Sequence, residues 1–292
     1  MSGWRTVVIK GRSKLDLRYN KIVVRSEEDL KLIHIPEVLM LILETTSISI
    51  TAALMCELIK QKIKVIFCDE KHNPHFELIP FYGSHDSVEK IKQEISWTDD
   101  LKARLWTLIV KEKIKNQMLL LKKLKKQEFE ELILCMNNLE YNDVTNREAV
   151  ASKIYFTSLF GDSFNRKNDN ALNSFLNYGY QIIHSTFNRE IVANGYLTQL
   201  GIFHSNQFNY FNLTSDIMEP FRAIVDELAI IEKPEEIGEN EKRKLQNILN
   251  LKYKIDGKYY FLSDVIRIYT KSIFDALNSN DINLVKFFEN EL

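Results

Sequence analysis

The hydrophobic pattern of this chain changes once, near residue 82, and that change limits what it can fold into. Within residues 5–82 the apolar residues form short runs, and the alternation in Leu15–Leu17 is typical of a strand with one buried face. Farther on, apolar residues recur every three or four positions, as one buried helical face requires at Ile183, Phe187 and Ile191. The sequence therefore predicts an α+β protein, with an N-terminal strand-rich domain and a mostly α-helical C-terminal domain.

The strand-rich domain is expected to contain one helix. Its apolar runs are separated by turn signals such as Tyr19-Asn20-Lys21, and the composition of residues 52–62 is helical. A continuous apolar strand follows at residues 64–68, so strand, helix and strand predict a local β-α-β insert. The expected strands are TVVI, KLDLRY, KIVVR, LKLIHI, SISIT and KVIFC.

The domain boundary is expected where Pro80, Gly83 and the polar SHDS segment interrupt both patterns. We therefore predict a strand-rich domain at residues 1–82, a linker at 83–97 and a helical domain at 98–292. Because the chain has only nine glycines and five prolines, its loops should be short.

Composition limits the class of protein. With 45% apolar and 11% aromatic residues, 292 residues can bury one large core or two ordinary ones. A net charge of −1 does not favour nucleic-acid binding, so any contact with DNA would come from local basic patches. Cys56, Cys68 and Cys135 lack zinc-ligand spacing and are odd in number, which fits a reducing compartment. No apolar run approaches the roughly 20 residues of a membrane span, so we expect a soluble, cytoplasmic protein without a membrane partner.

Four residues of the C-terminal half have side chains that suit a divalent metal: Glu148, His204, Asp216 and Glu219. Carboxylates are hard oxygen donors for magnesium or manganese, and imidazole suits manganese or zinc. Each residue also has a plainer interpretation. Glu148 could stabilise a helix start, and His204 could be a satisfied core histidine. Asp216-x-x-Glu219 has the spacing of a capping box ahead of Pro220, and the residues alone leave these alternatives open.

Longer segments around these residues resemble a known family. Glu148 lies in NREAVASKIYFTSLFG, and the other three residues lie in LTQLGIFHSNQFNYFNLTSDIMEPFR. These segments, the opening SGWRTVV, the VIFCDE segment and the spacing between them resemble the CRISPR adaptation integrase, the universal endonuclease/integrase of CRISPR-Cas systems. The variant that the chain resembles accompanies type II-A loci, and the resemblance covers almost the whole chain.

The resemblance implies a site and its chemistry. Glu148, His204 and Glu219 would hold a catalytic Mg²⁺ or Mn²⁺. Asp216 would not bind the ion directly but would orient the metal-bound group or its neighbours. The ion would lower the pKa of the 3′-hydroxyl of a prespacer and neutralise charge on the target phosphate. The result would be insertion of short prespacer duplexes into the leader end of a CRISPR array, and with water as nucleophile the same site would be an endonuclease.

The resemblance also implies partners. The strand-rich domain would form a homodimer, and two homodimers would flank a dimer of CRISPR-associated protein two in a heterohexamer. The nucleic-acid substrates would be double-stranded prespacer DNA and CRISPR leader-repeat DNA. The type II-A accessory ring protein and the effector nuclease are further expected partners.

Candidates for DNA contact lie beside the proposed ligands. Asn209 belongs to a segment of amides and rings, residues 206–212, which suits either unpaired DNA ends or a packed turn. Nine cations between residues 99 and 126 make a basic helical region that is either a DNA-binding face or a solvated one. Three further cations flank the ligands and could grip a phosphate or pair with the acids: Arg147, Lys153 and Arg222.

Two functions from other classes stay open at this point. The chain could be a non-catalytic DNA-binding scaffold subunit whose acids only cap helices, in which case Glu148→Ala and His204→Ala would lose no activity. It could also be a metal hydrolase acting on a substrate other than nucleic acid, which would show no salt-dependent DNA binding.

Overall fold

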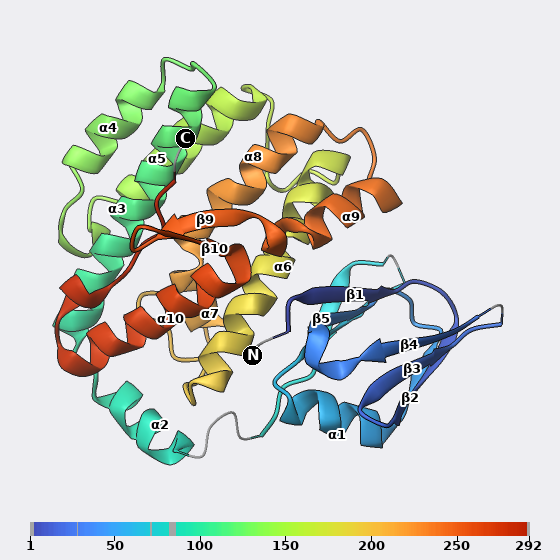
Figure 1. Ribbon diagram of the computed structural model, residues 1–292. Coiled ribbons are helices and arrows are strands. Elements are labelled where there is room, and N and C mark those ends of the chain that lie inside the picture. Colours follow the sequence, from blue (N-terminus) through green and yellow to red (C-terminus); the bar gives the residue numbers. More distant parts are fainter. Residues whose placement is uncertain (1–2, 28, 71, 82–85, 291–292) are drawn as a thin grey trace. The chain divides into compact units, whose positions relative to one another are not determined.

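The protein divides into two compact units, Met1–Gly83 and Ser84–Leu292, which Figure 1 shows as a strand-rich and a mostly helical part of the chain. Their elements confirm the α+β class predicted from the sequence. Residues 82–85, where the linker was expected to begin, lie outside the described residues, and helix α2 (Ser87–Ser96) takes up most of the remaining interval. The computed structural model describes residues 3–27, 29–70, 72–81 and 86–290.

Two four-stranded sheets, one α-helix and one short 3-10 helix make up the described part of the first unit. One sheet has the order β1-β5-β7-β8, and the other has the order β4-β3-β2-β6. Apolar residues of both sheets and of α1 meet in one buried cluster that includes Leu15, Leu41 and Leu54. The elements are β1 (Arg5–Ile9), β2 (Ser13–Arg18), β3 (Lys21–Arg25), β4 (Leu30–His34), η1 (Ile35–Glu37), β5 (Val38–Leu43), β6 (Ile48–Ile50), α1 (Ala52–Lys60), β7 (Lys64–Cys68) and β8 (Pro74–Glu77).

The turn expected at Tyr19 and Asn20 is confirmed. Both residues adopt left-handed backbone angles, with φ of 46° and 59°, and they join the antiparallel strands β2 and β3. Two such residues form the turn whose twist matches a hairpin.

The predicted β-α-β insert is wrong. β6 pairs in parallel with β2, whereas β7 pairs in parallel with β5 in the other sheet. Strand β5 is not predicted from the sequence, because all six of its residues are buried and such a strand has no alternation.

The helical unit is organised around two long helices, α3 (Asp99–Lys123) and α6 (Ala171–Ala193). The Thr98 hydroxyl begins α3 by accepting a hydrogen bond from Leu101 N–H, and the face predicted for α6 is buried. No helix in the described part of the chain is both long and apolar enough to cross a bilayer. The other helices are α4 (Phe129–Asn137), η2 (Tyr141–Asp143), α5 (Arg147–Phe160), α7 (Asn212–Ile217), η3 (Glu219–Phe221), α8 (Arg222–Glu232), α9 (Glu239–Gln246), η4 (Ile248–Asn250), α10 (Leu262–Ser279) and η5 (Ile282–Leu284).

The helical unit also contains a hairpin that sequence analysis missed. Strands β9 (Lys252–Ile255) and β10 (Lys258–Phe261) pair in antiparallel fashion around Asp256-Gly257. Both turn residues have positive φ, 51° and 72°, and Asp-Gly between apolar runs is a strong hairpin signal. The C-terminal domain is mostly helical as predicted, and this hairpin is an exception that the sequence analysis did not include.

Candidate active site

Glu148 lies in the first turn of α5 with its carboxylate unused by the helix end. Asp143 serves that end instead, since its Oδ1 accepts a hydrogen bond from Arg147 N–H at 2.6 Å and its Oδ2 one from Glu148 N–H at 3.1 Å. The Glu148 side chain is 21% exposed and reaches Lys113 on α3. The helix-start interpretation of Glu148 therefore does not explain its side chain.

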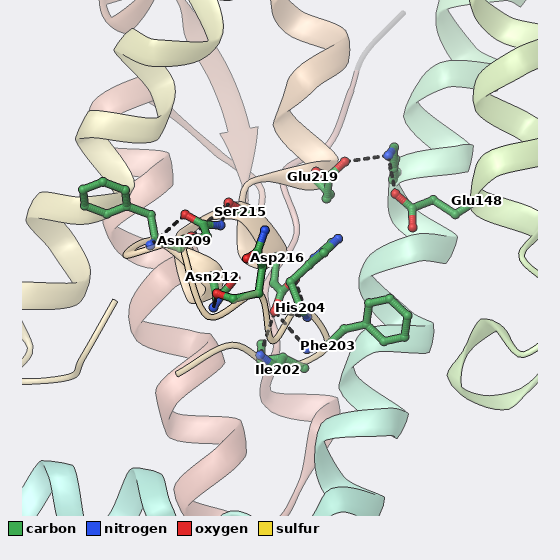
Figure 2. A network of polar contacts seen from close by, with 12 residues as sticks. Glu148, Ile202, Phe203, His204, Asn209, Asn212, Ser215, Asp216 and Glu219 are labelled. Atoms are coloured by element: carbon green, nitrogen blue, oxygen red, sulfur yellow. Dashed lines mark hydrogen bonds and ion pairs between the residues drawn. The ribbon is translucent and has the colours of Figure 1, made fainter. Parts of the chain in front are cut away.

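His204 lies in the loop before α7 and is held there by Asp216. Asp216 is fully buried, and its Oδ2 accepts hydrogen bonds from Ile202 N–H at 2.7 Å and Phe203 N–H at 2.9 Å. Its Oδ1 accepts a hydrogen bond from Nδ1 of His204, as Figure 2 shows. This hydrogen bond raises the pKa of His204 in spite of the partial burial of the ring.

The two plainer interpretations of this segment are wrong. Asp216 lies inside α7 and spends its carboxylate on the His204 loop, so it does not form a capping box with Glu219. The His204 side chain is 44% exposed, which excludes a core histidine. The loop approaches Asp216 so closely that a Cβ on Gly201 would lie 2.1 Å from the carbonyl oxygen of His204.

Trp106 of α3 forms the wall behind His204. The indole is fully buried and stacks on Phe203, with 4.5 Å between ring centroids and 3° between planes. The His204 ring meets the same indole edge to face, with centroids 5.6 Å apart. With Nδ1 bound to Asp216 and the ring packed on Trp106, Nε2 is the nitrogen left for a ligand.

Glu148 and Glu219 meet at one nitrogen, and their side chains point toward each other in Figure 2. Nζ of Lys113 lies 2.6 Å from Oε1 of Glu148 and 2.6 Å from Oε2 of Glu219. The second oxygen of Glu219, Oε1, accepts a hydrogen bond from Arg222 Nε at 2.8 Å. Two carboxylates and two cations therefore share one small volume.

The charges in this cluster stabilise each other. Burial alone would raise the pKa of Glu219, but Arg222 and Lys113 lower it to about 2. Burial would also lower the pKa of Lys113, yet the carboxylates of Glu219 and Glu148 raise it above its ordinary value. The Glu219 carboxylate is consequently ionised at neutral pH and ready to bind a cation.

The site residues fit a divalent cation in type but are not gathered around one. Among residues 3–27, 29–70, 72–81 and 86–290, no three His, Cys, Asp or Glu side chains converge at metal-ligand distances. Oε2 of Glu219 is buried and has no hydrogen bond of acceptable geometry, although the Lys113 ammonium lies beside it. Two carboxylates, one with an unsatisfied buried oxygen, and an imidazole backed by a carboxylate are a donor set for Mn²⁺ or Mg²⁺.

A buried hydrogen-bond network next to this cluster holds Arg222 in place. Asp226 of α8 is buried and accepts hydrogen bonds from the hydroxyls of Tyr155, at 2.9 Å, and Tyr180. Burial raises the pKa of Asp226 to about 6, although both hydroxyls lower it. The Arg222 guanidinium packs over the Tyr180 ring, 4.9 Å from its centroid, which fixes the partner of Glu219.

The candidates for DNA contact have different surroundings. Arg222 is engaged with Glu219, and Arg147 is half-buried, whereas Lys153 is exposed on α5. The Asn209 side chain stabilises a turn, since its Oδ1 accepts a hydrogen bond from Phe211 N–H at 3.0 Å. The packed-turn interpretation of residues 206–212 therefore applies to its amides. Two rings of the segment are exposed, namely Phe208 and Tyr210.

The basic region of α3 is not one uniform face. Arg104 pairs with Asp100 at 2.9 Å, and Lys123 pairs with Glu227 at 2.6 Å. The Lys113 side chain points into the site and contacts Glu148 and Glu219. Sequence analysis counted Lys113 among the solvated or DNA-binding cations, and the missed signal was its place four residues after the buried Ile109, on the apolar face of the helix.

Comparison with known proteins places the chain beside one family. The family model described as CRISPR associated protein Cas1 matches residues 6–235. The CRISPR-associated endonuclease Cas1 of Neisseria meningitidis serogroup C (strain 8013) is 30% identical over 224 residues, which are 76% of this chain and 74% of that protein.

Solved structures share the fold. A chain of a Cas6-RT-Cas1–Cas2 complex has a TM-score of 0.76 at 16% identity, over 100% of this chain and 36% of that much longer one. A casposase bound to integration product has a TM-score of 0.75 at 18% identity, over 96% of this chain and 93% of the other.

Proposed function

The chain belongs to the CRISPR-associated Cas1 family, and on that premise we propose that it is a metal-dependent DNA integrase and endonuclease of CRISPR adaptation. The observation that carries the proposal is the meeting of two carboxylates, Glu148 and Glu219, near an imidazole whose Nδ1 is bound to buried Asp216. Such a donor set suits phosphodiester chemistry on DNA better than capping of helices.

Glu148, Glu219 and Nε2 of His204 would hold Mg²⁺ or Mn²⁺. When bound, such an ion supplies positive charge at the scissile phosphate and lowers the pKa of an attacking hydroxyl. Asp216 fixes the orientation of the His204 ring and keeps a proton on Nδ1, so that Nε2 faces the site. Arg222 keeps Glu219 ionised and in place.

The reaction exchanges one phosphodiester for another. The 3′-hydroxyl oxygen of a prespacer strand forms a bond to a target phosphorus in the leader-repeat DNA, and the bond from that phosphorus to the 3′-oxygen of the target strand breaks. The hydroxyl proton ends on the leaving oxygen through solvent. Because the bond made and the bond broken are both phosphodiester bonds, no nucleoside triphosphate is needed. With water as the nucleophile, the same site would cut DNA as an endonuclease.

We place the reaction in a cytoplasmic nucleoprotein assembly. The Cas6-RT-Cas1–Cas2 complex supports Cas2 as a partner. In the proposed assembly, two homodimers of this chain would flank a Cas2 dimer. The strand-rich unit would form the homodimer. The type II-A accessory ring protein and the effector nuclease would be further partners of this assembly.

The test uses a labelled branched DNA that mimics a half-integrated product, with the purified chain in Mn²⁺, in Mg²⁺ or in chelator. The parent should reseal the branch only with metal, and Glu148→Gln and His204→Ala should abolish resealing. Glu140→Gln is the matched control, because Glu140 is exposed and outside the site. DNA binding without strand exchange in any metal, even after Cas2 is added, would favour the scaffold function instead.

A further inference from the structure

Lys113 stands out among the cations of the helical unit because it lies between the two proposed carboxylate ligands. Its Nζ is 2.6 Å from Oε1 of Glu148 and 2.6 Å from Oε2 of Glu219, and its side chain is 10% exposed. By contrast, Lys115 on the same helix is 46% exposed and pairs with Glu112 outside the site. α3 therefore directs one lysine into the cluster and leaves the other at the surface.

Burial of this ammonium has to be compensated. Ile109, Val110 and Ile114, which surround Lys113 on α3, are fully buried, and an unpaired charge among them would be strongly unfavourable. Three residues along the helix, Asn116 donates a hydrogen bond from Nδ2 to the carbonyl oxygen of Pro220 at 3.0 Å. Helix α3 thus holds the Glu219 segment by its backbone as well as by the ion pair.

The two acids depend on Lys113 to different extents. Glu219 has Arg222 as a second cation, with Nε 2.8 Å from its Oε1. For the Glu148 carboxylate, no other cation or hydrogen-bond donor lies in contact within the described part of the chain. Without Lys113, and without a metal ion, Glu148 would face Glu219 with its charge uncompensated.

A divalent cation bound between these acids would use the oxygens that the ammonium contacts. The ion and the Lys113 ammonium would then both lie against these two carboxylates with charges of the same sign, at a site where little water screens them. The metal ion and the Lys113 ammonium therefore cannot occupy the space between the two carboxylates at the same time.

We propose that Lys113 is a built-in counter-cation of the active site: its ammonium keeps Glu148 and Glu219 together before a metal ion binds, and the ion displaces it. This inference rests on the proposed metal-dependent function. It assigns to Lys113 a positioning role in the metal-free protein and makes it a competitor of the metal.

The first experiment measures thermal unfolding in chelator. Lys113→Met and the hydrogen-bonding variant Lys113→Gln should melt about 5 °C or more below the parent. Adding Glu148→Gln to Lys113→Met should restore most of the loss, because it removes the uncompensated charge. Lys122→Met is the matched control and should melt with the parent, because Lys122 is exposed on the same helix and outside the site. Melting of the Lys113 variants at the parent temperature, or no recovery in the double variant, overturns the counter-cation role. If the single variants fail to fold and the double variant folds, the role is supported.

The second experiment titrates Mn²⁺ into the parent and Lys113→Gln by calorimetry. Loss of the competing ammonium should tighten Mn²⁺ binding about tenfold or more. Equal or weaker binding overturns the displacement. The His204→Ala variant separates this result from the proposed function: if the parent binds no Mn²⁺ in a His204-dependent manner, the proposed metal site itself is wrong. The unfolding experiment then decides the counter-cation role without metal.

Discussion

Replacing Glu94 by glutamine should remove a large part of the pH dependence of the stability of the helical unit. Glu94 lies in α2 with 1% of its surface exposed, and its Oε2 accepts a hydrogen bond from Leu197 N–H at 2.9 Å. Its Oε1 is buried without a hydrogen-bond partner. This hydrogen bond holds Leu197, at the start of the segment that leads to His204, against α2. A change at Glu94 can therefore also alter the position of His204.

The magnitude follows from the pKa of this carboxyl. Burial raises the pKa of Glu94 from 4.5 to about 7, against the lowering effect of the Leu197 amide and of Lys102. The folded protein therefore favours the protonated form, and Glu94 contributes most stability below pH 4.5. That contribution is lost as the pH rises through about 7, and the pKa difference corresponds to about 3 kcal/mol.

The assay is urea unfolding followed by far-UV circular dichroism, which reports mainly on the helical unit, between pH 4.5 and about pH 8. Glu94→Gln keeps an acceptor for Leu197 N–H and cannot ionise, so its unfolding free energy should fall less with pH than that of the parent. Glu89→Gln, an exposed acid on the same helix, is the control. Equal pH slopes for the parent and Glu94→Gln would refute the reasoning.

Four further changes test the site and its support. Gly201→Ala would place a Cβ 2.1 Å from the carbonyl oxygen of His204 and 2.9 Å from Oδ2 of Asp216, so the loop must shift; strand transfer should fall at least about tenfold, and the melting temperature should fall as well. Asp216→Asn should lower the pKa of His204, measured by NMR titration, because the hydrogen bond from Nδ1 now raises it. Phe208→Ala should weaken binding of single-stranded DNA by about 1–3 kcal/mol in a fluorescence titration, since the ring is 81% exposed. Thr98→Ala should lower the unfolding free energy by about 1 kcal/mol through loss of the α3 cap, as urea unfolding would measure.

Local sequence signals predicted local structure well. The buried face of α6, the turn at Tyr19 and Asn20, and the helix that begins next to Glu148 all follow from patterns within a few residues. The Asp256-Gly257 turn carried an equally clear signal and was missed only because the surrounding region was interpreted as helix throughout.

Strand pairing could not be predicted in the same way. β6 and β7 flank one helix in the sequence, yet they belong to different sheets, because β6 pairs with β2 and β7 pairs with β5. A buried strand such as β5 also lacks the alternation that would identify it.

The sequence by itself determined the division into a strand-rich and a mostly helical part and the types of side chain at the candidate site. Only the tertiary structure decided that Asp216 lies behind His204 and does not cap a helix, and that Lys113 meets Glu148 from 35 residues away. These contacts join different elements, and packing of the helices sets their distances. A local pattern fixes which face of α3 is buried, but the partner of a buried charge depends on which carboxylates the folded chain brings to that face.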